Sequence, residues 1–226
     1  MLDIGYFKRR QQLIELRFNP YHDPSNGRFC SGGGGNSGKA IDKSAENSYN
    51  DSGEDAISIT KASINAVKKP EIFDDDEMNK NVQVLCQRLL TETANDPPNT
   101  ERAYSISLEN LKGDIENVVR SKGADGEGAV QIKSLNEPYL SIHNHPSGKT
   151  MSLKDVREFL FDYRVKCIVV VGNNGNVYFL KKAPNADTSS ALPKVQAYIK
   201  GRITAKSDNE FMKGLSEYGI DYKEYT

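Results

Sequence analysis

Residues 139–155 read Tyr-Leu-Ser-Ile-His-Asn-His-Pro-Ser-Gly-Lys-Thr-Met-Ser-Leu-Lys-Asp. The apolar beginning of this stretch predicts a short strand, and Pro146-Ser147-Gly148 predicts the turn that ends it. Because side chains alternate between the two faces of a strand, His143 and His145 are expected to point to the same side. The segment from Ser152 to Asp155 has the pattern of a helix start. The stretch therefore predicts a strand, a short loop and a helix in succession.

The side chains of His143, His145 and Asp155 have the chemistry of a zinc site. The chain has only three histidines, and two of them lie here, one residue apart. Imidazole nitrogens and carboxylate oxygens bind zinc, and three protein ligands leave the fourth tetrahedral position for water, as in catalytic sites. Two other interpretations remain open. The histidines could be packed in the core or face solvent, and Asp155 could simply belong to a helix capping box with Ser152.

The order His-x-His-Pro, short loop, Ser-x-x-Asp resembles the JAMM motif of the JAB/MPN metallopeptidase family. His-Asn-His-Pro-Ser-Gly at 143–148 is similar to the bacterial DNA-repair-associated branch of that family. The loop 146–151 is one residue shorter than in the best-known members, a feature of phage-borne relatives. The resemblance covers about residues 79–183. It implies a JAB/MPN-like mixed sheet, zinc held by the two histidines and the aspartate, and hydrolysis of an amide or isopeptide bond.

The resemblance also implies two residues that act on the substrate. Ser152 matches the serine that hydrogen-bonds the oxyanion beside the metal, although its position equally suits a helix cap. The family's proton-transferring glutamate lies on a strand upstream of His-x-His, and Glu101 matches that position. Glu116 and Glu127 are competing candidates, and a surface glutamate at a strand start is the simpler interpretation of Glu101.

The rest of the chain predicts an α/β fold, a mixed sheet flanked by helices. Val82, Leu85, Cys86 and Leu89 have helical spacing, and 101–108 alternates like a half-buried strand. Further strands are expected at 115–119, 166–171 and 177–180, and further helices around 192–199 and 211–218. The last helix is expected to end at Gly219.

The N-terminal region differs in composition from the remainder. From about residue 19 to 56 the chain is rich in Gly, Ser, Asn and Asp, which bury too little apolar surface to offset the entropy of ordering. Residues 1–75 are therefore expected to be a flexible tail or linker that could dock a partner, and 76–226 the folded domain. Residues 18–29 resemble the "Asp-Pro-x-x-Gly-Arg-Phe" element of phage head-morphogenesis proteins. The alternative is a turn-rich linker, because Asn-Pro, Asp-Pro and Asn-Gly all favour turns. Gly33 to Lys39 resembles a Walker A loop, but Ala40 follows it and no buried strand precedes it.

Composition argues against several classes of function. Thirty basic and 31 acidic residues give a net charge of −1, so the balance does not favour nucleic-acid binding. No apolar run predicts a membrane span or a signal peptide, and the expected location is the cytoplasm, that of the host if the protein is phage-encoded. The three cysteines, Cys30, Cys86 and Cys167, are scattered and predict neither disulfides nor a cysteine-rich zinc site.

The sequence thus favours a zinc-dependent peptidase or isopeptidase of the JAMM type. Peptides or conjugates of ubiquitin-like proteins are the implied substrates. The alternative is a JAB-like interaction module of a phage or mobile-element protein that docks a partner without turnover. A DNA-associated role follows only from the resemblance to the repair branch, and the balanced charge argues against it.

Overall fold

The structure is a computed structural model that describes residues 56–226. The glycine-rich stretch, the phage-like element at 18–29 and Cys30 all lie outside the described residues. The elements in chain order are α2 (Lys61–Ala66), α3 (Asp76–Thr93), β1 (Arg102–Ser107), η1 (Asn110–Lys112), β2 (Val119–Lys122), β3 (Tyr139–His145), α4 (Leu153–Phe161), β4 (Val165–Gly172), β5 (Val177–Lys182), α5 (Thr188–Ile199), α6 (Asp208–Lys213), η2 (Gly214–Tyr218) and β6 (Ile220–Tyr225).

The six strands form one mixed sheet in the order β2-β1-β3-β4-β5-β6. Strands β3 and β4 are parallel and are joined through α4, whereas every other neighbouring pair is antiparallel. A parallel pair needs a crossover connection, and α4 provides it. The predicted α/β class, a mixed sheet flanked by helices, is therefore confirmed.

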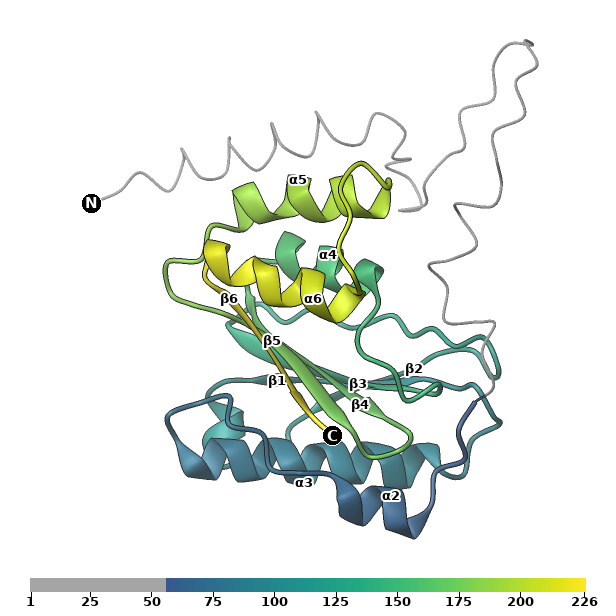
Figure 1. Cartoon of the computed structure of the whole chain (residues 1–226). Coiled ribbons are helices and arrows are strands. Elements are labelled where there is room, and N and C mark those ends of the chain that lie inside the picture. Colours follow the sequence, from purple (N-terminus) through teal and green to yellow (C-terminus); the bar gives the residue numbers. More distant parts are fainter. Residues whose placement is uncertain (1–55) are drawn as a thin grey trace, which may run out of the picture. The chain divides into compact units, whose positions relative to one another are not determined.

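The sheet separates two layers of helices (Figure 1). Helices α2 and α3 cover one face, and α4, α5 and α6 cover the other. Along β3, Leu140 and Ile142 join the core beneath α3, whereas Tyr139 joins the core beneath α4. Because side chains alternate along a strand, His143 and His145 lie on the face covered by α4.

Helix α3 shows why the sequence prediction worked in this part of the chain. Asp75 caps it by accepting hydrogen bonds from the amides of Glu77 and Met78, and acidic residues occupy its first turn, where they favour the helix dipole. The four apolar residues that carried the predicted spacing are all fully buried: Val82, Leu85, Cys86 and Leu89. Cys167 is also fully buried, so the interpretation of both described cysteines as small core residues is confirmed.

Three details differ from the sequence prediction. Residues 56–75 were assigned to a linker, yet they contain α2, and Val67 and Ile72 belong to the buried core. The strand expected at 115–119 is found at 119–122, where it pairs with β1. Strand β6 was not predicted, although Ile220 and Tyr222 are buried and the residues between and after them are exposed, as on a half-buried strand.

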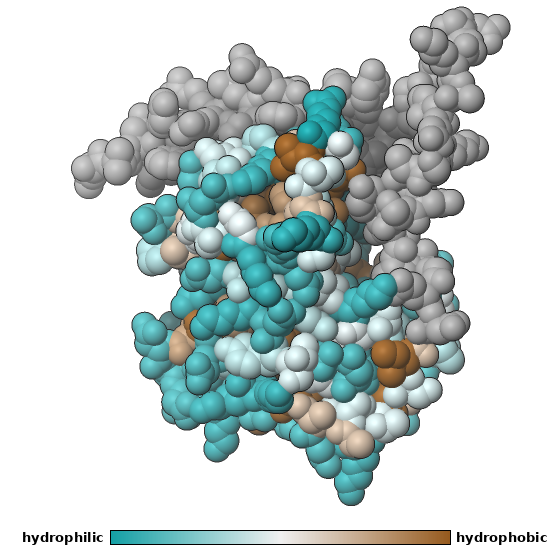
Figure 2. All heavy atoms as spheres, in the orientation of Figure 1, coloured by the Kyte–Doolittle hydropathy of each residue, from teal (hydrophilic) through white to brown (hydrophobic). Residues whose placement is uncertain are grey.

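The described surface is largely polar. Figure 2 shows a mostly hydrophilic face with a few scattered apolar spots. Across residues 56–226, the large apolar side chains that are clearly exposed are Ile57, Val119, Phe161 and Tyr163. No helix in this part of the chain is long and apolar enough to cross a membrane.

Candidate metal centre

The two histidines project from the end of a buried central strand. His143 pairs with Ala103 of β1 on one side and with Val170 of β4 on the other. Their side chains are almost completely buried, with 2% of His143 and 4% of His145 exposed. Strand β3 thus places two imidazoles side by side at its C-terminal end, where the loop to α4 begins.

The loop after β3 returns the chain so that α4 begins beside these imidazoles. Gly148 turns the loop with φ of +74°, and its amide donates to the carbonyl of His145. The positive φ favours glycine at this position, and a Cβ would also force the side chain of Asn174, 2.7 Å away, to shift. Six residues between His145 and Ser152 therefore suffice to bring Asp155 to the histidines.

The three predicted ligands converge. The Nε2 atoms of His143 and His145 are 3.1 Å apart, and they lie 3.6 Å and 3.4 Å from Oδ2 of Asp155. A tetrahedron with zinc–nitrogen distances of about 2.0–2.1 Å has edges of about 3.3–3.4 Å. In the described part of the chain, His143, His145 and Asp155 form the one group of three metal-binding side chains close enough together to hold an ion.

The hydrogen bonds around the imidazoles also suit a cation. Nδ1 of His145 lies 2.9 Å from the carbonyl oxygen of Thr150, so that nitrogen carries the proton and leaves a lone pair on Nε2. Nδ1 of His143 is buried and has no hydrogen-bond partner in the described part of the chain. The two facing Nε2 atoms and the carboxylate oxygen share protons when no cation is bound, and a divalent cation could take the place of those protons.

Asp155 is held in its ionised form. Burial alone would raise the pKa of its carboxyl group, but the neighbouring imidazoles of His143 and His145 outweigh burial and hold the pKa well below its usual range. A carboxylate must be deprotonated to bind a metal, so Asp155 is ready to act as a ligand near neutral pH.

Ser152 caps α4 and orients Asp155. Its hydroxyl accepts a hydrogen bond from the amide of Asp155 and donates its proton to Oδ2 of the same residue at 2.7 Å. The amide of Ser152 donates to that oxygen at 2.8 Å. The capping interpretation is therefore confirmed. The oxyanion role stays a prediction, because the single hydroxyl proton points to Asp155 in this structure.

Replacing Ser152 with alanine is expected to lower zinc affinity by about 10–100-fold, because the ligand loses the donor that orients it. The lost cap should also cost about 1 kcal/mol of stability. Ser207 is the matched control, since its hydroxyl caps α6 by accepting from the amide of Glu210. Ser207→Ala should lose similar stability and keep wild-type zinc affinity, as measured by chelator competition. Equal zinc affinity in both variants would refute the idea that Ser152 orients Asp155 for metal binding.

Glu101 lies immediately before β1 and is 5% exposed. The last pair of the β1–β3 ladder is Ala103 with His143, and Glu101 lies two residues before Ala103, where its carbonyl still accepts from the amide of Gly123 beside β2. Alternation puts Glu101 on the same face as both imidazoles. The two competing carboxylates are exposed. Glu116 pairs with Arg88 of α3, and Glu127 lies in the loop after β2. Of the three carboxylates, Glu101 is the buried one, and its role in proton transfer stays a prediction.

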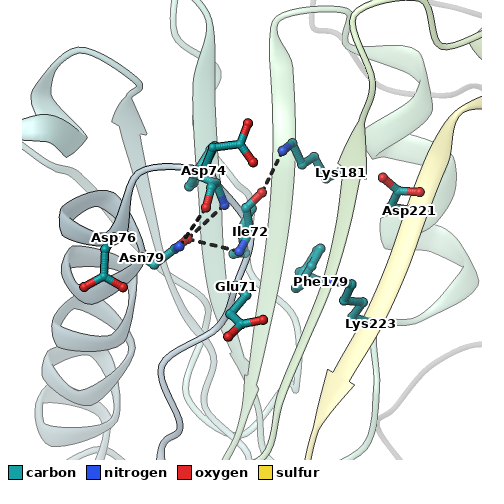
Figure 3. A pocket seen from close by; sticks show the side chains of 10 residues that line it. Glu71, Ile72, Asp74, Asp76, Asn79, Phe179, Lys181, Asp221 and Lys223 are labelled. Carbon is teal, nitrogen blue, oxygen red and sulfur yellow. Dashed lines mark hydrogen bonds between the residues drawn. The ribbon is translucent and has the colours of Figure 1, made fainter.

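A separate groove lies between residues 71–79 and strands β5 and β6 (Figure 3). Its polar atoms are largely used by the segment before α3. Asn79 accepts from the amides of Ile72 and Phe73, and Lys181 donates to the carbonyl of Ile72. The residues that line the groove carry charges of both signs and include none of the candidate metal ligands. The hydrogen bonds of Asn79 and Lys181 instead hold the segment before α3 against the sheet.

No protein-family model, no curated protein and no solved structure matches this chain. The assignment of the site consequently rests on the residues themselves and on the geometry that the fold gives them.

Proposed function

We propose that the protein is a zinc-dependent metallopeptidase or isopeptidase of the JAMM type, acting in the cytoplasm. The observation that carries the proposal is the convergence of His143 Nε2, His145 Nε2 and Asp155 Oδ2 within 3.6 Å of one another. These residues come from a strand and from the first turn of the following helix, the context in which the JAMM motif presents its ligands. A bound zinc ion would acidify water and polarise the scissile carbonyl.

The residues around the ligands have distinct proposed roles. Glu101 accepts a proton from the attacking water and delivers it to the leaving amine, which is the standard work of a buried carboxylate beside a metal. Its place on the histidine face supports this role. Ser152 holds Asp155, and in the substrate complex its hydroxyl would turn to the oxyanion. Peptides and isopeptide-linked conjugates of ubiquitin-like proteins are the proposed substrates.

The alternative is a non-catalytic, JAB-like interaction module of a phage or mobile-element protein, which docks a partner without turnover. Among the described residues, the clearly exposed large apolar side chains are those of Ile57, Val119, Phe161 and Tyr163. Aromatic residues are enriched at the centres of protein–protein interfaces. Phe161 and Tyr163, two residues apart in sequence, are therefore the side chains that could contribute to a partner surface.

The proposal is tested by incubating zinc-loaded protein with a fluorogenic peptide library and with isopeptide-linked ubiquitin-like conjugates. Cleavage is expected in the zinc-loaded wild type, its loss after chelation, and its return when zinc is restored. Asp155→Ala should be inactive under all three conditions. Stoichiometric zinc binding with no cleavage of any substrate would favour the interaction module, and absence of zinc binding by the folded protein would overturn the metallopeptidase and leave the interaction module.

A further inference from the structure

Asn144, the residue between the two histidines, hydrogen-bonds the backbone on either side of Glu101 although its side chain lies on the opposite face of the sheet from the imidazoles. It is fully buried, and alternation puts its side chain on the face covered by α3, away from the imidazoles. Its carboxamide nevertheless reaches the segment that carries Glu101. The side-chain oxygen accepts from the amide of Arg102 at 2.8 Å, and the side-chain nitrogen donates to the carbonyl of Thr100 at 3.2 Å.

These two bonds bracket Glu101. The backbone pairing between β1 and β3 ends at Ala103 and His143, so the carboxamide of Asn144 takes over where main-chain pairing stops. On the other side, the carbonyl of Glu101 accepts from the amide of Gly123 at 2.8 Å. The main chain of Glu101 is thus held from both sides, by β3 through Asn144 and by the residue that follows β2.

The orientation of the carboxamide is determined by its partners. The amide of Arg102 can only donate and the carbonyl of Thr100 can only accept, so oxygen and nitrogen cannot be exchanged. The nitrogen also donates to Oδ1 of Asn173 at 3.1 Å, and the amide of Asn173 donates to the carbonyl of His145 at 3.0 Å. One buried network therefore connects the Glu101 segment to the backbone of a candidate zinc ligand.

We infer that Asn144 is a positioning residue: its carboxamide fixes the backbone on both sides of Glu101 and so sets that carboxylate beside the ligands His143, His145 and Asp155. This inference rests on the proposed function for its catalytic consequence, but the bracketing itself is independent of it. A proton-transferring group must lie within hydrogen-bond reach of its partner, and a displacement of about 1 Å can cost about 100-fold in rate.

The test compares Asn144→Ala with Asn79→Ala. Asn79 is the matched control, a buried asparagine whose side chain likewise makes three hydrogen bonds, in its case all to the backbone of Ile72 and Phe73 before α3. Amide hydrogen exchange measured by NMR should show the Arg102 amide exchanging about tenfold faster in Asn144→Ala and unchanged in Asn79→Ala. Both variants should retain one zinc per chain, since neither side chain is a ligand.

With a cleavable substrate, Asn144→Ala should lower kcat by about 10–100-fold and leave KM nearly unchanged, whereas Asn79→Ala should retain wild-type kcat. If Asn144→Ala does not fold, Asn144→Asp replaces it. Asn144→Asp keeps the acceptor for the Arg102 amide but loses the donor to the Thr100 carbonyl, so the amide should stay protected while kcat falls.

Two results would overturn the inference: unchanged exchange at Arg102 in Asn144→Ala, or equal kcat in Asn144→Ala and Asn79→Ala. A wild type without zinc or activity would instead remove the proposed function, and the exchange measurement would still decide whether Asn144 holds the Glu101 segment.

Discussion

Replacing His143 with alanine is expected to reduce bound zinc from one ion per chain to none that elemental analysis can detect. The two remaining ligands cannot hold the ion against buffer, because losing a ligand costs more than the about 10–100-fold in affinity that is typical of losing a residue that only hydrogen-bonds a ligand. Asp155→Ala should behave in the same way, since its carboxylate completes the triangle with His143 and His145.

The third histidine of the chain provides the matched control. His22 lies outside the described residues, and His22→Ala should retain one zinc per chain. Thermal unfolding gives a second readout, because an ion that binds only the folded state stabilises it by about 2.7 kcal/mol at 100 times Kd. Zinc should therefore raise the Tm of the wild type and of His22→Ala but not that of His143→Ala. Retention of zinc by His143→Ala would place the metal elsewhere.

Replacing Glu101 with glutamine should abolish most hydrolysis while the zinc remains bound. Glutamine has nearly the same shape but cannot accept and release a proton, so kcat should fall by about 10²–10⁴-fold, the usual contribution of a general acid–base group. The side chain is not one of the three converging ligands, which is why zinc content should not change. Single-turnover cleavage and elemental analysis on the same preparation separate the two effects.

The two competing carboxylates are the controls for that experiment. Glu116 is exposed and paired with Arg88 on the far face of the sheet, and Glu127 is exposed in the loop after β2. Glu116→Gln and Glu127→Gln should keep wild-type kcat and zinc content. A large loss of activity in Glu127→Gln together with an active Glu101→Gln would assign the proton transfer to the loop instead.

The sequence alone determined the elements whose signals are local. A short apolar run and the Pro-Ser-Gly turn located β3, and the Ser152 cap located the start of α4, because caps and turns depend on residues a few positions apart. The helical spacing of apolar residues located α3, and a continuous apolar run located β4. The three candidate ligands were found because all of them lie on one short strand–loop–helix unit.

The tertiary structure decided everything that depends on pairing over long distances in sequence. Edge strands β2 and β6 are defined by hydrogen bonds to β1 and β5, and the buried part of residues 56–75 is ordered by packing on α3 and the sheet. The burial of Glu101 and the hydrogen bonds of Asn144 share this origin. Asn144 contacts the amide of Arg102 across 42 residues of sequence, and no local pattern encodes such a contact.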